Sequence, residues 1–230
     1  MSFSSVIAID GPSGSGKSTV AKELAKNLNI LYIDTGAMFR ALAFSAHSQG
    51  VDLENEKAVK NFLDEIKLDY QTDDGCLVKV DNVDLSDKIR EHEVSKLASI
   101  ISQIPCVRSY LLDFQRDLAK SKVCVMEGRD IGTVVFPDAF CKFFITASIE
   151  VRAKRRFDQL AESGQENVDL EQLMKDVKKR DDKDTNRDVA PLKASEDASV
   201  IDTSDMPLEL VISSLKNCVQ SKAREVGITL

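Results

Sequence analysis

The chain lacks several features that mark common protein classes. Among its 230 residues there is no tryptophan, and no apolar run approaches the roughly 18 residues that a membrane-spanning helix needs. The first residues lack a basic stretch and become glycine-rich after four apolar residues, unlike a signal peptide. The five cysteines are scattered without a CxxC pair, which argues against a zinc site or a disulfide framework. These absences predict a cytoplasmic globular protein that has no membrane partner.

Charge is unevenly distributed along the chain. The sequence holds 38 acidic and 31 basic residues, a formal net charge of -7. Residues 51–93 contain 13 acidic and 6 basic residues, whereas the rest of the chain contains 25 of each. This acidic segment is therefore expected to be a distinct module, an insert. A nucleic-acid partner is not expected, because Lys and Arg contacts to phosphates dominate such binding.

Short apolar segments alternate with segments of helical periodicity. Apolar runs predict core strands at residues 6–9, 30–33, 123–126, 142–146 and 198–202. Helical patterns occupy residues 17–28, 37–49, 57–66, 94–120 with an interruption near Pro105, 150–183 and 207–224. A small antiparallel element is expected around residues 76–80, after a turn at Asp73, Asp74 and Gly75. The alternation predicts an α/β fold whose parallel sheet is covered on both faces, with ligands beyond the carboxyl ends of the strands.

A glycine-rich segment lies between the first expected strand and the first expected helix. Residues 11–18 read GPSGSGKS and fit the pattern G-x-x-x-x-G-K-[ST] of a phosphate-binding loop. In such a loop the main-chain N–H groups and the helix N-terminus surround a phosphate. Lys17 would reach the β- and γ-phosphates, and the hydroxyl of Ser18 would bind Mg²⁺. The segment predicts an ATP site that is made of Gly11, Pro12, Ser13, Gly14, Ser15, Gly16, Lys17, Ser18 and Thr19.

This loop does not by itself define a reaction. The guanine-reading motif N-K-x-D is absent from the sequence, which argues against a GTPase. Glu127 ends an apolar run, where an acidic residue could position magnesium or water, or could equally be a solvated strand end. Both interpretations of Glu127 remain open from the sequence.

Arginines follow the ends of other expected strands. Arg40 and Arg129 lie beside turn glycines, and Arg180 and Arg187 end the charged helical segment. A guanidinium group binds phosphate oxygens in a bidentate way, so these residues suit a second phosphate site. A phosphate acceptor is already ionised and needs no general base, which agrees with a chain whose only histidines, at positions 47 and 92, are expected at the surface. Three further arginines could contact a ligand from a lid or could lie on a solvated helix face: Arg152, Arg155 and Arg156.

At these residues the sequence resembles the bacterial cytidylate kinases, a family of nucleoside monophosphate kinases. Five segments carry the resemblance: GPSGSGKST (11–19), DTGAMFR (34–40), SIISQIPCVR (99–108), EGRDIGTVVFPDA (127–139) and RDDKDTNRDVAPL (180–192). They span nearly the whole chain, and the last two are specific to the family. Two positions depart mildly from its usual pattern, with Thr35 in place of Ser and Phe39 in place of Tyr.

The resemblance implies a three-layer P-loop NTPase fold with a monophosphate-binding insert and a helical lid. The core would comprise residues 1–36, 94–150 and 190–230, the monophosphate-binding region residues 37–93, and the lid residues 151–189. It also implies transfer of a phosphoryl group from magnesium-ATP to CMP or dCMP, catalysed by Lys17, Arg129, Arg180 and Arg187. The implied cytidylate contacts are Thr35, Arg40, Ser99, Arg108, Arg129, Asp130, Asp184 and Arg187.

Within that family Arg40, Arg129 and Arg187 would bind the phosphate, Ser99, Arg108 and Asp130 the cytosine edge, and Asp184 with Arg187 the sugar hydroxyls. The protein is expected to be a monomer. Two other hypotheses remain at this point: a kinase for UMP, AMP, shikimate or dephospho-coenzyme A, and a nucleotide-gated switch that hydrolyses slowly. A switch needs only one nucleotide pocket, whereas the arginines suit a second phosphate site.

Overall fold

The computed structural model describes residues 4–71, 75–120, 122–162 and 169–230, and it divides into two compact units. Unit 1 comprises Met1–Ile33 and Ala119–Leu230, and unit 2 comprises Asp34–Leu118. The predicted core included residues 94–118, but the helices of that segment pack on the second helix of the chain and therefore lie in unit 2. In the part of the chain that is described, no helix is both long and apolar enough to cross a bilayer.

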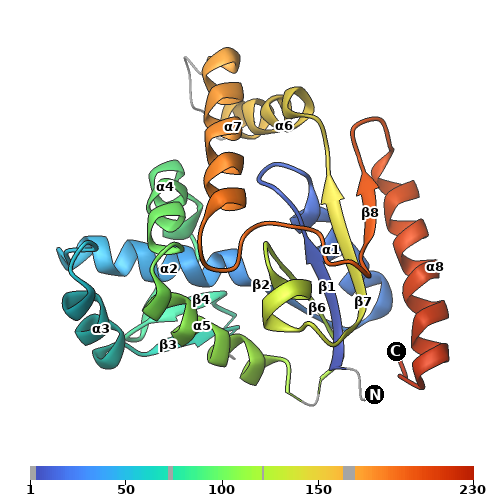
Figure 1. Cartoon of the computed structure of the whole chain (residues 1–230), viewed down its shortest axis with the longest axis horizontal. Helices are drawn as coiled ribbons and strands as arrows, with labels where there is room; N and C mark the ends of the chain where they lie inside the picture. Colours follow the sequence, from blue (N-terminus) through green and yellow to red (C-terminus); the bar gives the residue numbers. More distant parts are fainter. Residues whose placement is uncertain (1–3, 72–74, 121, 163–168) are drawn as a thin grey trace. The chain divides into compact units, whose positions relative to one another are not determined.

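Unit 1 is organised around a five-stranded sheet in the order β2-β6-β1-β7-β8 (Figure 1). The strands are β1 (Ser4–Asp10), β2 (Leu31–Asp34), β6 (Cys124–Gly128), β7 (Ala139–Thr146) and β8 (Ser199–Asp202). The pairs of β1 with β6, β1 with β7 and β7 with β8 are all parallel. The expected α/β fold with a parallel sheet is therefore confirmed, and the carboxyl ends of β1 and β6 meet at one edge of that sheet.

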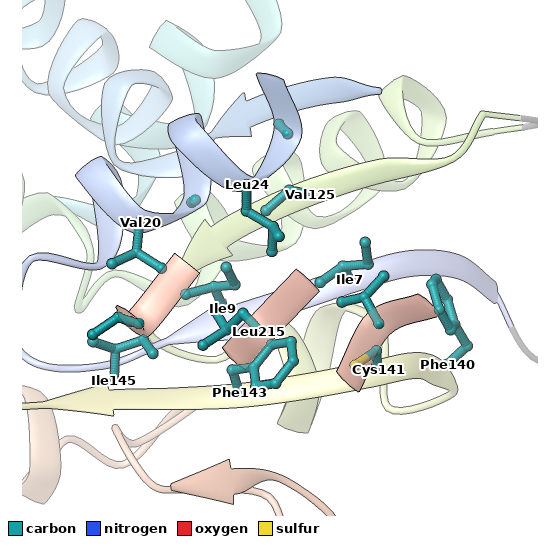
Figure 2. Close-up of a cluster of buried hydrophobic side chains, with 14 of the residues drawn as sticks. Ile7, Ile9, Val20, Leu24, Val125, Phe140, Cys141, Phe143, Ile145 and Leu215 are labelled. Atoms are coloured by element: carbon teal, nitrogen blue, oxygen red, sulfur yellow. The ribbon is translucent and has the colours of Figure 1, made fainter. Parts of the chain in front are cut away.

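Two helices cover one face of this sheet and bury the main core with it. They are α1 (Lys17–Leu28) and α8 (Leu208–Val226). Figure 2 shows Val20 and Leu24 from α1 and Leu215 from α8 packed on β-branched and aromatic side chains of the strands. Burial of such side chains contributes about 1.5 to 3 kcal/mol each. This packing fixes where α1 begins, and with it the loop that joins β1 to α1.

The remaining helices of unit 1 form a pair that follows β7. Helix α6 (Ile149–Glu162) packs on α7 (Leu170–Asn186) through a small apolar cluster that includes Leu160 and Leu173 (Figure 1). The carboxylate of Asp169 accepts a hydrogen bond from the N–H of Glu171 and caps α7. A single turn of π-helix, η2 (Ile131–Val135), follows β6, and the sequence pattern did not predict it.

Unit 2 contains the acidic segment and its supporting helices. Its helices are α2 (Thr35–Ser48), α3 (Glu56–Glu65), the 3₁₀ turn η1 (Lys88–Arg90), α4 (His92–Ile101) and α5 (Pro105–Leu118). Its antiparallel sheet joins β3 (Leu68–Tyr70), β4 (Val78–Val80) and β5 (Val83–Asp84). The small antiparallel element is thus confirmed, while residues 72–74 of the expected turn, including Asp73 and Asp74, lie outside the described residues.

Candidate phosphoryl-transfer site

The loop between β1 and α1 has a backbone that its glycines make possible. Gly11 has a φ of 154°, and a Cβ atom there would lie 2.0 Å from the carbonyl oxygen of Ile145. Gly14 has a φ of 75°, and a Cβ atom there would lie 3.1 Å from the Cβ of Arg152. Side chains at these two positions would therefore be strained and crowded. The glycines let the loop approach β7 and α6 closely.

Two side chains at the start of α1 make hydrogen bonds beside the loop. The Lys17 ammonium is buried and donates a hydrogen bond to the carbonyl of Pro12 at 3.3 Å, so it lies over the loop. The Ser18 hydroxyl donates to Oε2 of Glu127 at 2.8 Å. Glu127 is 2% exposed at the end of β6, and its Oε1 accepts a hydrogen bond from the Tyr32 hydroxyl at 2.6 Å. Glu127 is therefore a buried carboxylate that accepts these two hydrogen bonds, rather than a solvated strand end.

This pair of oxygen donors fits Mg²⁺. The ion prefers oxygen ligands and is held in kinases by one or two protein groups together with substrate phosphates and waters. Ser18 and Glu127 supply a hydroxyl and a carboxylate side by side, next to the phosphate loop. Groups of three or more acidic, His or Cys side chains suited to a metal do not occur among the described residues. A magnesium ion bound with ATP does not require such a group.

Two of the three arginines expected in a lid hold the phosphate loop from outside. Arg152 is buried, and its guanidinium donates to the carbonyls of Ala147 at 2.8 Å and Ser13 at 3.2 Å. Arg155 donates to the carbonyl of Ser15 at 3.0 Å and to Thr203. Burial lowers the pKa of this guanidinium, but an arginine stays charged at neutral pH. Both residues thus contact carbonyls of the loop. The sequence had suggested only a contact with a ligand or a solvated helix face for them.

Arg156, the third of these arginines, lies next to them on α6. Its guanidinium donates to the side-chain oxygen of Gln159 at 3.5 Å, on the same helix. The structure therefore separates three arginines that the sequence treated alike: Arg152 and Arg155 hold the loop, whereas this contact of Arg156 is local.

Two ion pairs connect the end of β6 with the end of α7. Nε of Arg129 lies 3.0 Å from Oδ2 of Asp184, and Nη2 of Arg187 lies 3.5 Å from Oδ1 of Asp130. Burial alone would raise the pKa of Asp184, but Arg129, Arg180 and Arg187 hold it below the usual range. Four residues that the sequence assigned to cytidylate binding are therefore brought together within unit 1, and they leave Asp184 ionised at neutral pH.

Asp10, at the end of β1, was not among the expected site residues. Its side chain is 4% exposed, and it accepts hydrogen bonds from the N–H groups of Ile131 and Gly132, both at 2.8 Å. Burial raises its pKa to about 7, with Asp130 adding to the shift and the two amides and Arg129 opposing it. No local sequence signal distinguishes Asp10, because its partners are more than a hundred residues away along the chain.

The other expected cytidylate residues lie in unit 2. Thr35 is buried at the start of α2, where Asp34 caps the helix by accepting the N–H of Ala37 at 3.0 Å. The second oxygen of Asp34 accepts a hydrogen bond from Arg40 at 3.0 Å. A Cβ at Gly36 would lie 3.0 Å from the Arg40 guanidinium, so this glycine leaves room for the pair.

Arg108 and Ser99 also lie in unit 2, on different helices. The Arg108 guanidinium donates to the carbonyl of Ser102 at 3.1 Å and lies 5.4 Å from the centre of the Phe39 ring, a cation–π contact. Phe39 replaces the tyrosine usual in the resembled family, and its ring alone is enough for this contact. Ser99 lies on α4, where its carbonyl accepts hydrogen bonds from Ser102 and Gln103. Arg108, Ser99 and Phe39 therefore all belong to unit 2.

The histidines and the buried cysteines are the side chains to consider as a general base or a nucleophile. His47 is exposed on α2, as expected, and the side chain of His92 lies outside the described atoms. The cysteines Cys124 and Cys141 are buried in the core, and burial raises the pKa of each thiol to about 12. These thiols are therefore packing residues rather than nucleophiles.

Comparison with known proteins agrees with this geometry. A family model described as "Cytidylate kinase" matches residues 7–221. The chain belongs to the cytidylate kinase family. A cytidylate kinase of Pelotomaculum thermopropionicum is 46% identical over 221 residues, which cover 95% of this chain and 97% of that protein. Cytidylate kinases of Shouchella clausii and Halalkalibacterium halodurans are each 44% identical, over 95% and 94% of this chain and 97% of each relative. The resemblance that was inferred from five motifs is thereby confirmed.

Proposed function

We propose that the protein transfers the γ-phosphoryl group of ATP to CMP or dCMP, giving ADP and CDP or dCDP. Membership of the cytidylate kinase family supports this reaction, as do the names of relatives that match almost the full chain. The observation that carries the proposal is local to unit 1. A phosphate loop with a buried lysine lies at the end of β1, and two arginine–carboxylate pairs follow the adjacent strand β6.

The donor side of the reaction would use the loop itself. Its main-chain N–H groups and the N-terminus of α1 would bind the phosphates of ATP, and Lys17 would neutralise charge on the β- and γ-phosphates. Ser18, with Glu127 beside it, would hold the magnesium ion that comes with ATP, and that ion would supply electrostatic stabilisation of the phosphate charge. Arg152 and Arg155 would keep the loop carbonyls turned outward, which leaves the N–H groups for the nucleotide.

The acceptor side would use guanidinium groups. Arg129 and Arg187 would bind the phosphate of CMP, and Asp184 would accept hydrogen bonds from the sugar hydroxyls. Because Asp184 is ionised at neutral pH, it can act as an acceptor there. The acceptor phosphate is itself ionised, so the reaction needs no general base. Four residues of unit 2 would contribute further contacts, with the roles that the family resemblance implies: Thr35, Arg40, Ser99 and Arg108.

The helix pair α6 and α7 would act as a lid. Arg180, near the end of α7, would approach the transferring phosphoryl group when the lid closes, and closure would exclude water that could otherwise accept that group. Arg156 would be the lid arginine best able to reach a nucleotide, since Arg152 and Arg155 hold the loop. Unit 2 would provide the monophosphate-binding region, and the enzyme would act as a monomer.

The test is a competition between acceptors. The full chain is given magnesium-ATP with CMP, dCMP, UMP and AMP, first singly and then together, and formation of ADP and of each diphosphate is measured. We expect CDP and dCDP to dominate, because buried polar groups that match the cytosine amine would be left unpaired by other bases. Preferential phosphorylation of AMP, or ATP hydrolysis that no acceptor stimulates, would contradict the proposal.

A further inference from the structure

Residues Gly128–Gly132 form a short arch after β6 that carries Arg129 and Asp130. Both charged side chains point to partners near the end of α7, Arg129 to Asp184 and Asp130 to Arg187. The arch has neither regular strand pairing nor an α-helical turn of its own, since β6 ends at Gly128 and the π-turn begins at Ile131. The positions of its two charged groups therefore depend on what holds its ends.

Asp10 holds both ends of this arch. In the parallel pairing of β1 with β6, Asp10 lies opposite Gly128, the first residue of the arch. The two carboxylate oxygens of Asp10 accept the N–H groups of Ile131 and Gly132, its last two residues, at 2.8 Å each. One residue thus fixes the chain before Arg129 and after Asp130. Asp10 also directly precedes Gly11, so it joins the arch to the start of the phosphate loop.

The surroundings of this carboxylate leave it little freedom to move. It is 4% exposed, so water competes little for its two amide partners. A Cβ atom at Gly132 would lie 3.1 Å from Cδ of Lys142 and 3.5 Å from Oδ2 of Asp10. The lysine stem therefore closes over the glycine, while its ammonium is held by the carbonyl of Pro137 and by Asp197. Asp10 is therefore buried beside Gly132, with the Lys142 stem packed against the same glycine.

We propose that Asp10 is a positioning residue for recognition of the monophosphate, acting through Arg129 and Asp130. The inference rests on the proposed function, because it takes the arch to bind CMP. A merely structural role for Asp10 would affect the two nucleotides alike. The positioning role instead predicts that loss of Asp10 weakens CMP binding while ATP binding is retained.

The test compares Asp10→Asn with the wild-type chain. Asparagine has the same shape but only one acceptor oxygen, so its NH₂ group would face a main-chain N–H and one bond would be lost. Equilibrium binding of CMP and of a non-hydrolysable ATP analogue is measured separately by calorimetry, with KM and kcat, at about pH 8.5, above the Asp10 pKa of about 7, so that the wild-type group is a carboxylate. We expect the Kd for CMP to rise about 10- to 100-fold, with the Kd for the ATP analogue close to that of wild type.

Val125→Ala is the matched control. Val125 lies on the same strand, β6, but in the core under α1, away from the arch. Truncating it should lower stability and leave both affinities unchanged. Asp10→Asn that binds CMP like wild type, or that loses CMP and ATP affinity equally, would overturn the inference.

Gly132→Ala gives an independent test if Asp10→Asn does not fold. The added methyl group would press on Lys142 and on the bond to Asp10 while the carboxylate remains. A smaller change in the same direction, confined to CMP, is expected, and equal loss of both nucleotides would count against Asp10. Wild-type protein that fails to bind or phosphorylate CMP would refute the proposed function instead, so the two failures are distinguishable.

Discussion

The phosphate loop and the arginine arch follow adjacent parallel strands, but they are built in different ways. The loop is a contiguous run, Gly11–Ser18, whose shape comes from glycines and from the start of α1. The arch is held by a carboxylate from β1 and by ion pairs with α7, which lies some 55 residues further along the chain. The loop is thus a local structure whose main-chain N–H groups would bind the phosphates. The arch instead presents side chains, and their placement depends on distant segments.

This difference implies different responses to substitution. Damage to the loop should remove turnover, because its groups act on the transferring phosphoryl group. Damage to the arch should first weaken one substrate, because its side chains are suited to binding and depend on their supports. The following predictions test that contrast, in order of expected effect.

The largest effect is expected for Lys17→Ala. Loss of the ammonium that neutralises charge on the transferring group should lower kcat by about 1,000-fold or more. Thermal unfolding should change far less than kcat, because the hydrogen bond from the ammonium to the carbonyl of Pro12 is a single interaction within the loop. Lys26→Ala, an exposed residue on the same helix, is the control. Near-wild-type kcat in Lys17→Ala would refute the role of Lys17.

Titration of Asp10 should make stability depend on pH. Its pKa is raised to about 7 in the folded state, above the usual 3.8. Between these values the folded chain keeps a proton that the unfolded chain has lost, so the contribution of Asp10 to stability falls as pH rises from about 4 to 7. The free energy of unfolding of wild type relative to Asp10→Asn should therefore decrease by about 2 to 4 kcal/mol over this range.

Denaturant unfolding of both proteins at each pH measures this difference. Arg129, Asp130 and Lys142 are the charged groups that lie near Asp10. A difference that stays constant, or that grows with pH, would show that the carboxyl is ionised throughout.

A smaller effect is expected for Arg129→Met. Methionine keeps much of the side-chain volume but removes the guanidinium that would bind the acceptor phosphate. The Kd for CMP should rise about 100-fold, whereas binding of an ATP analogue should be retained. Calorimetric titration with each nucleotide measures this. An equal loss of both would show that the arch and the loop act as one site.

The smallest effect is expected for Arg155→Ala. Its guanidinium supports the carbonyl of Ser15 together with Thr203, whose hydroxyl also donates to that carbonyl at 3.1 Å. Because one support remains, ATP affinity should fall only about 10-fold, without a change in CMP affinity. Lys154→Ala, an exposed neighbour paired with Asp158, is the matched control. Unchanged ATP affinity in Arg155→Ala would show that Thr203 alone suffices.

Most of the fold could be predicted from hydrophobic pattern. The strands, the helices and the small antiparallel element follow from apolar runs, breakers and helical periodicity, because these signals are local. The π-turn Ile131–Val135 could not be predicted, since the N–H groups of its first two residues donate to Asp10, which precedes them by more than a hundred positions. The expected core included residues 94–118, whereas α4 packs on α2 and lies with it in unit 2.

The candidate site divides in the same manner. The motif predicts roles for Lys17 and Ser18 from their spacing along the loop, and the structure begins α1 at Lys17. The sequence left open whether Glu127 is a functional or a solvated carboxylate. It also could not tell that Arg155 contacts the loop whereas Arg156 contacts Gln159, because adjacent residues on a helix point in different directions. Asp184 would have passed for a surface residue of a charged helix, yet it is buried in an ion pair with Arg129.

The sequence by itself determined the order of strands and helices, the phosphate loop and the family, because each depends on neighbours in the chain or on motifs that can be read directly. Only the tertiary structure decided which carboxylates are buried, which guanidinium groups they hold, and that Asp10 supports the arch. The physical reason is that burial and ion pairing depend on residues far apart in sequence, which become neighbours only when parallel strands pair and helices pack on them.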